Sequence, residues 1–90
     1  MKMTLEEVMK SIKEERDYQD KKWDSLDERE QSIPGYMLVL RKELEEAEIG
    51  WCKNIPGKHS SLAEMCQIAA VAIACLQQHG IEGNGGANKS

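Results

Sequence analysis

Hydrophobic residues recur at the spacing of an α-helix in three stretches of the chain, and no stretch shows the strict alternation of a half-buried strand. The apolar stripe of the first stretch comprises Leu5, Val8, Met9 and Ile12. Thr4 and Glu7 precede this stripe at the spacing of a capping box, in which two side chains satisfy the first free backbone donors of a helix. We therefore expect a helix that begins at Thr4 and ends near Trp23 or Asp24.

The second stretch begins at Ser32-Ile33-Pro34, because proline is tolerated in the first turn of a helix. Its predicted inner stripe comprises Met37, Leu40, Leu44, Ala47 and Trp51. Gly50 and the run from Cys52 to Gly57 are expected to end this helix. The segment before it, Ser25 to Gln31, is charged and short of apolar anchors, and it predicts a loop or a frayed turn.

The third stretch starts at Ser60 or Ser61 and runs to His79, with Gly80 as its C-terminal stop. Ser61 and Glu64 have capping-box spacing. The run Ile68 to Leu76 is apolar on almost every side, as in helices that are buried all round. Two helices of the same chain cannot easily wrap such a helix. We therefore expect it to lie at the centre of a homo-oligomeric bundle, most simply a two-fold dimer.

These patterns predict an all-α fold, a helical bundle of three main helices per chain that homo-oligomerisation completes. Residues 1–81 form the single helical domain, and residues 82–90 form a disordered tail rich in glycine and asparagine. Phenylalanine is absent and aromatic residues make up 4% of the chain. So thin an aromatic core is a further indication that partner subunits supply part of the burial.

The net charge of −4 argues against a general nucleic-acid binder, so we expect no binding to nucleic-acid duplexes. The longest uncharged apolar run has nine residues, whereas a membrane span needs about twenty, so no contact with a membrane is expected. The N-terminal stretch lacks the apolar region of a signal peptide. The cysteines at 52, 66 and 75 have no metal-binding spacing and indicate reduced thiols. Together these features predict a cytoplasmic protein.

Candidate chemistry comes from acids on the inner faces of the second and third helices. Glu43 falls inside the apolar arc of its helix and Glu46 falls at the edge of that arc. Burial of a carboxylate is costly unless the group is paired or binds a metal. Glu64 and Gln67 repeat the spacing of three on the third helix. On facing antiparallel helices these four oxygen-bearing groups would surround one point, and such oxygens are the ligands that Mg²⁺ and Mn²⁺ prefer.

A simpler interpretation exists for each of these acids. Glu64 has the spacing of a capping-box residue, and Glu43 and Glu46 belong to a helix with many surface acids. Both interpretations stay open at the level of sequence. The two histidines, His59 in a loop and His79 at a helix end, are assigned structural roles.

The inner stripe of the first helix turns polar halfway along, where it continues as Glu15, Arg16, Gln19, Lys22 and Trp23. Arg16 and Lys22 could neutralise phosphate, and Gln19 could hydrogen-bond a base. Trp23 could stack on a base or pack against the protein. The alternative is that this half of the helix passes beyond the core and is solvated, with Arg16 paired to a nearby acid.

Three blocks of the sequence, residues 15–23, 42–47 and 64–72, resemble the MazG-like all-α nucleoside triphosphate pyrophosphohydrolases. They are most similar to the short, single-domain members common in phages and prophages. The resemblance covers about residues 5 to 80. Its best-defined element is an ExxE motif followed after a loop by ExxD, which reads here Glu43-x-x-Glu46 and Glu64-x-x-Gln67.

The resemblance implies a homodimer or homotetramer that holds Mg²⁺ or Mn²⁺ and hydrolyses a (deoxy)nucleoside triphosphate to the monophosphate and pyrophosphate. Carried over by position, Glu43, Glu46 and Glu64 are the expected catalytic residues and metal ligands, and Gln67 takes the fourth ligand position. The expected nucleotide-binding residues are Arg16, Gln19, Lys22 and Trp23. A viral origin would place the protein in the cytoplasm of the host cell.

The chain departs from the family pattern at two positions. Lys42 stands where the family often has an additional acid, and Gln67 replaces the last acid of the second motif. An amide offers a carbonyl oxygen without charge, so this change should weaken metal binding. The alternative function is therefore a catalytically weak or inactive MazG-like module that binds nucleotide or contacts a host protein. A purely structural helical oligomer is a third hypothesis, which the inward Glu43 disfavours.

Overall fold

The computed structural model describes residues 1–23 and 30–83, except for the side chain of Trp23. It contains the helices α1 (Leu5–Trp23), α2 (Ile33–Cys52) and α3 (Ser61–His79), together with the short 3₁₀ helix η1 (Gly57–His59). No strand is present in the described residues, which confirms the all-α class with three main helices. Most of the predicted loop at 25–31 and of the predicted tail at 82–90 lies outside the described residues.

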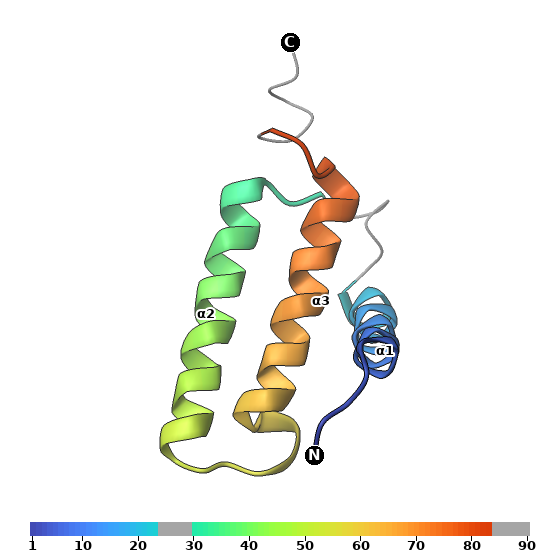
Figure 1. Ribbon diagram of the computed structural model, residues 1–90. Coiled ribbons are helices and arrows are strands. Elements are labelled where there is room, and N and C mark those ends of the chain that lie inside the picture. Colours follow the sequence, from blue (N-terminus) through green and yellow to red (C-terminus); the bar gives the residue numbers. More distant parts are fainter. Residues whose placement is uncertain (24–29, 84–90) are drawn as a thin grey trace.

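α3 is the central helix of the chain. α2 and α3 run antiparallel side by side, and α1 packs on α3 at a steep angle (Figure 1). α2 and α3 are joined by a loop that contains η1, which contacts both of them. The antiparallel arrangement brings the last turns of α2 close to the first turn of α3, where Glu64 lies.

Two helix ends are capped as the sequence predicts, one by side chains and one by a glycine. Thr4 N donates to Glu7 Oε1 at 2.9 Å and Glu7 N donates to Thr4 Oγ1 at 3.1 Å, which is the predicted capping box. The backbone N–H of Gly80, which has a positive φ of 84°, donates to Leu76 O at the end of α3. The predicted bounds of α1 and α3 are therefore confirmed.

The cap at the start of α3 differs from the predicted capping box. Ser60 is the N-cap residue, and its Oγ accepts from Ala63 N at 3.2 Å. A box built on Ser60 would place its acid at position 63, which is alanine. The predicted pairing of Ser61 with Glu64 is therefore wrong, and the Glu64 carboxylate is free for another role.

Gly50 does not end α2, as the sequence suggested, but lies buried within it. A Cβ atom at this position would lie 2.8 Å from His59 O and 3.1 Å from Ser61 N. A glycine is needed here because the chain between η1 and α3 crosses directly over α2. The helix ends two residues later, where Lys53 N donates to Ile49 O and Asn54 takes a positive φ of 53°.

A small core lies between α2 and α3. It consists of Tyr36, Val71 and Ala74, with Val39, Leu40 and Cys75 packed against it. The predicted inner stripe of α2 is only partly confirmed. Ala47 is buried and Leu40 is half-buried, whereas Met37, Leu44 and Trp51 are exposed. The apolar stripe of α2 is wider than the contact with one neighbouring helix, so α3 covers only one side of it.

α3 also keeps apolar side chains at the surface of the single chain. Its exposed apolar residues are Leu62, Met65, Ile73 and Leu76. By length and composition α3 is apolar enough to cross a membrane, but a core helix passes the same test. α3 packs on both α1 and α2, as a core helix does. The absence of membrane contact stays a prediction.

We expect Ser60→Ala to lower the free energy of unfolding by about 1 kcal/mol, because it removes the side-chain cap of α3. Ser61→Ala is the matched control, because its side chain does not cap, and we expect a change of less than about 0.5 kcal/mol. Urea unfolding followed by circular dichroism measures both. Equal losses in the two variants would contradict the assignment of the cap.

Candidate functional site

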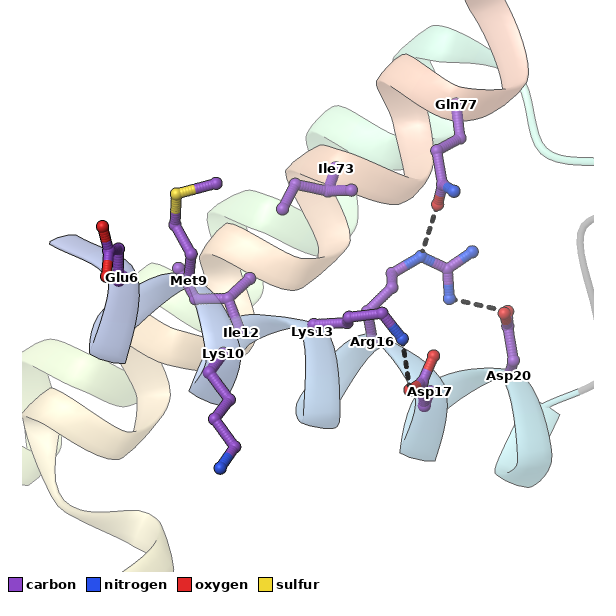
Figure 2. Close-up of a pocket in the computed structure, with 10 residues that line it drawn as sticks. All are labelled: Glu6, Met9, Lys10, Ile12, Lys13, Arg16, Asp17, Asp20, Ile73 and Gln77. Atoms are coloured by element: carbon purple, nitrogen blue, oxygen red, sulfur yellow. Dashed lines mark hydrogen bonds and ion pairs between the residues drawn. The ribbon is translucent and has the colours of Figure 1, made fainter.

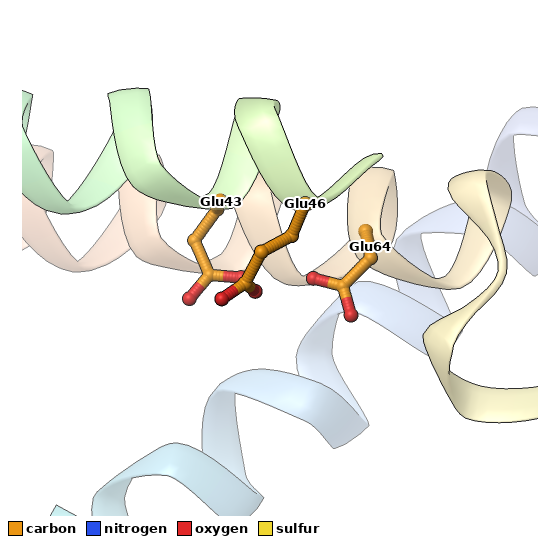
Figure 3. Close-up of side chains that lie close together, drawn as sticks. All are labelled: Glu43, Glu46 and Glu64. Atoms are coloured by element: carbon orange, nitrogen blue, oxygen red, sulfur yellow. The ribbon is translucent and has the colours of Figure 1, made fainter. Parts of the chain in front are cut away.

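Three carboxylates converge where the C-terminal half of α2 faces the first turn of α3. Glu43 and Glu46 lie one turn apart on α2, and Glu64 comes from α3. One ligand oxygen from each lies within 4.8 Å of the other two. Figure 3 shows the three side chains pointing to the same side of the helix pair. The predicted convergence of these acids is therefore present in the fold.

Two of the three acids carry oxygens that are buried without a partner. Glu64 is only 2% exposed. It lies in the first turn of α3, where the helix dipole favours a negative charge. Its Oε2 atom and the Oε2 atom of the half-buried Glu43 have no hydrogen-bond partner among the described residues. Glu46 is exposed. Buried polar atoms of this kind are expected to find a partner, and ionised carboxylates can only accept, so they cannot satisfy one another.

The electrostatic result is visible at Glu43. The pKa of this carboxyl group is raised from 4.5 to about 7, first by burial and then by the contact and negative charge of the neighbouring Glu64 and Glu46. Without a cation, the cluster relieves its repulsion by holding a proton near neutral pH. A divalent cation would supply the same relief by binding to the ionised oxygens. The donor set of three carboxylates is the chemistry that Mg²⁺ and Mn²⁺ prefer.

The simpler interpretations of the acids can now be judged. Glu64 does not cap α3, because Ser60 does, so its burial needs another explanation. Glu43 is not a solvated surface acid, since it is partly buried and its pKa is raised. Gln67 lies one turn after Glu64 and is partly buried, but only its backbone oxygen has a known contact. Its place as a fourth ligand stays a prediction.

Gln19, one of the predicted nucleotide-binding residues, contacts α3 one turn after Glu64. It is 6% exposed, and its Nε2 donates to Glu15 Oε2 at 3.3 Å and to Gln67 O at 3.5 Å. These contacts place the polar half of α1 next to the turn of α3 that follows Glu64. The alternative in which this half of the helix is solvated is therefore wrong for Gln19.

Arg16 is buried too, but it points to another part of α3. Its Nε donates to Gln77 Oε1 at 2.9 Å and its Nη1 pairs with Asp20 Oδ1 at 2.6 Å (Figure 2). Gln77 lies ten residues beyond Gln67, which is about 15 Å along a helix. The guanidinium group lines a cavity of about 680 Å³ between α1 and α3 instead of facing the acids. Its observed partners match the interpretation in which Arg16 pairs with a nearby acid.

Lys22 and Trp23 are the last two residues of the predicted nucleotide-binding set. Lys22 is exposed and its Nζ lies 5.9 Å from the centre of the Tyr18 ring. The side chain of Trp23 lies outside the described residues, so its predicted stacking role stays untested.

The cysteines offer no activated nucleophile at this site. All of them are free thiols, as expected. Burial raises the pKa of Cys66 and of Cys75, and the charge of Glu15 raises that of Cys66 further. Buried thiols with raised pKa values are protonated at neutral pH and react slowly.

The sequence analysis missed one neighbour of the acids. His59 Nδ1 lies 3.5 Å from Glu64 Oε1. The residues are five apart in sequence, but α3 begins between them. Helical periodicity therefore gives no signal for this contact. The crossing of the η1 segment over Gly50 produces it, and a glycine in a helix interior was the one available hint.

Comparison with known proteins adds no relative: no family model, no curated protein and no solved structure matches this chain. The fold and the geometry of the acids therefore carry the functional argument.

We expect the metal-free protein to lose stability as the pH rises from 5 to 8. The pKa of Glu43 is about 7 in the folded chain and near 4.5 when unfolded, so folding favours the protonated form. This stabilisation is complete below pH 4.5 and disappears as the pH rises through 7. Because solvent screens the partly exposed group, we expect a loss of about 1 kcal/mol. Urea unfolding in the presence of a chelator measures the loss.

In Glu43→Gln this component of the pH dependence should disappear, because the amide does not titrate. Addition of Mg²⁺ or Mn²⁺ at pH 8 should restore stability to the wild-type protein, since the cation replaces the proton. The assignment would be contradicted if the free energy of unfolding changed by the same amount between pH 5 and 8 in the wild type and in the variant.

Proposed function

We propose that this protein is a divalent-cation-dependent pyrophosphohydrolase that converts a (deoxy)nucleoside triphosphate to the monophosphate and pyrophosphate. The observation that carries the proposal is the convergence of Glu43, Glu46 and Glu64 within 4.8 Å, with two buried oxygens that lack a partner. The resemblance of the sequence blocks to MazG-like enzymes supplies the substrate class. The proposal places the chain in that family.

The residues present fit a divalent cation. Glu43, Glu46 and Glu64 would hold Mg²⁺ or Mn²⁺, and they offer oxygen ligands only. When bound, the ion neutralises phosphate oxygens and activates water for attack. The raised pKa of Glu43 means that its proton leaves when the cation binds, so cation binding and proton release are linked.

The role of the chain's own residues is to hold and orient. Two rigid helices supply the acids, so the ligand oxygens are positioned before substrate arrives. Gln19 on α1 adjoins the same region and is proposed to contact the nucleotide, with Lys22 and Trp23 further along the helix. The role proposed for Arg16 is to hold α1 to α3 through its hydrogen bond to Gln77, and not to contact the nucleotide.

We also propose that a second copy of the chain covers the exposed apolar face shared by α2 and α3. Trp51 is 78% exposed and Leu62 is 80% exposed, and both line a surface hollow with Leu44 and Met65. Exposed apolar patches of this kind mark interfaces. The small residues of α3 would let another helix approach closely. A homodimer or homotetramer in the cytoplasm, without membrane or duplex nucleic acid, is the proposed state.

The second candidate function is a nucleotide-binding or host-protein-interaction module with little or no catalysis. Gln67 favours it, because a neutral amide stands in the position of the fourth acid. Fewer anionic ligands weaken the hold on a cation. In this case the three-acid cluster would still bind a cation and nucleotide, and turnover would be slow.

An assay that measures nucleoside monophosphate and pyrophosphate tests the first function. With Mn²⁺ or Mg²⁺ and a panel of nucleoside triphosphates, we expect monophosphate and pyrophosphate in equal amounts. Glu43→Gln and Glu64→Gln should lower the rate roughly a hundredfold or more, because each removes a charged ligand. Glu45→Gln is the control, since it makes the same change in charge at an exposed neighbouring position.

The result for Gln67→Asp separates the two candidate functions. An increased rate in this variant, above a measurable wild-type rate, supports the enzyme. Nucleotide binding without turnover in the wild type, with turnover gained in Gln67→Asp, supports the binding module. Neither binding nor turnover in any variant would refute both.

Light scattering tests the assembly. We expect a dimer or tetramer at micromolar concentration, and Leu62→Lys should yield monomers because a charge in an apolar interface is costly. Ile81→Lys is the control, because Ile81 is equally exposed but follows the end of α3. A wild-type monomer would contradict the proposed interface.

A further inference from the structure

His59 adjoins the acids and is the one imidazole found beside them in the described residues. A cavity of about 260 Å³ opens here, lined by Glu46, Ile49, Ile55, His59 and Glu64. Glu46 and Glu64 therefore lie next to His59 on one side and next to Glu43 on the other. The sequence predicted a structural role for His59, and the proposed function gives this histidine no part.

The backbone holds His59 in place. Its carbonyl oxygen packs on Gly50, where any Cβ atom would lie 2.8 Å away. Ser60 N donates to Gly57 O at 3.0 Å and Ile55 N donates to Gly50 O at 3.0 Å, so the loop is fixed on both sides of the histidine. The imidazole is 70% exposed and projects from this fixed segment toward Glu64. Its position is a product of the fold and not of a local helix pattern.

The spacing between the imidazole and Glu64 suits two ligands of one cation. His59 Nδ1 lies 3.5 Å from Glu64 Oε1, which is long for a hydrogen bond. Ligand atoms about 2.1 Å from a shared ion lie about 3.0 Å apart at a right angle and about 3.4 Å apart at a tetrahedral angle. The other oxygen of Glu64 is buried without a partner, which independently points to a missing ligand.

We propose that His59, Glu64 and Glu46 form a second cation position, which prefers a first-row transition-metal ion such as Mn²⁺ or Zn²⁺ to Mg²⁺. Imidazole nitrogen suits the transition metals, whereas Mg²⁺ selects sites made of oxygen. The inference rests on the proposed function, because Glu46 and Glu64 belong to the acid cluster described there. It adds that the metal preference of the protein is set by a histidine from the α2–α3 loop.

Pulsed electron paramagnetic resonance of Mn²⁺ bound to the full chain tests this position directly. At pH 7.5 we expect a coupling between Mn²⁺ and a ¹⁴N nucleus in the wild type, and its loss in His59→Ala. Calorimetric titration should show Mn²⁺ bound at least about tenfold more weakly by His59→Ala, with Mg²⁺ binding unchanged. His79→Ala is the matched control, because His79 contacts Gln31 O and not the acids. His59→Gln, which keeps a polar side chain, should lose the coupling as well.

The alternative is that His59 only pairs with Glu64 and binds no cation. Its removal would free a carboxylate and strengthen the binding of Mg²⁺ and Mn²⁺ alike, which would overturn the proposal. Absence of ¹⁴N coupling in the wild type would overturn it too. Failure of the hydrolase proposal is separate: Mn²⁺ held through His59 without pyrophosphate release refutes hydrolysis only. Hydrolysis without ¹⁴N coupling refutes only the histidine position.

Discussion

The contact between Glu64 and Glu43 is the constraint on which the rest of the structure depends. Two carboxylates, one of them almost completely buried, face each other across α2 and α3 with oxygens that no described residue satisfies. Both groups can only accept hydrogen bonds when ionised, so they cannot satisfy one another, and a proton or a cation between them would supply the missing partner. In the metal-free chain, burial and the neighbouring acids raise the pKa of Glu43.

The surrounding structure holds the acids in that arrangement. Ser60 caps α3, which leaves the side chain of Glu64 unused by the helix end. Gly50 allows the η1 segment to cross α2, so that α3 can begin close to the last turns of α2. The helix N-terminus offsets part of the cost of burying the Glu64 charge. The site is thus built from the C-terminal half of α2, the first turn of α3 and one close backbone crossing.

The same architecture leaves the chain with little core of its own. In the part of the chain that the structure describes, the buried apolar residues are few and, apart from Tyr36, small, while large side chains such as Trp51 and Leu62 remain at the surface. A chain of this length buries a modest share of its surface when it folds alone. An interface between copies would bury these side chains next to the helices that carry the acids. The proposed catalysis and the proposed assembly would then depend on the same pair of helices.

The sequence by itself determined the helices, because each has a capping residue and an apolar stripe that act locally. It also indicated the inward acid Glu43, since a charged residue within an apolar arc is visible on a helical wheel. It did not locate the edge of that arc. Met37, Leu44 and Trp51 lie exposed because, within the described residues, α2 packs mainly on α3.

Only the tertiary structure decided which acids meet and which polar residues join them. Arg16 and Gln19 are neighbours on one stripe, yet they reach turns of α3 that lie ten residues apart. The contact of His59 with Glu64 depends on a loop crossing that no periodicity encodes. Local patterns specify single helices, whereas the meeting of side chains from different helices depends on how those helices pack.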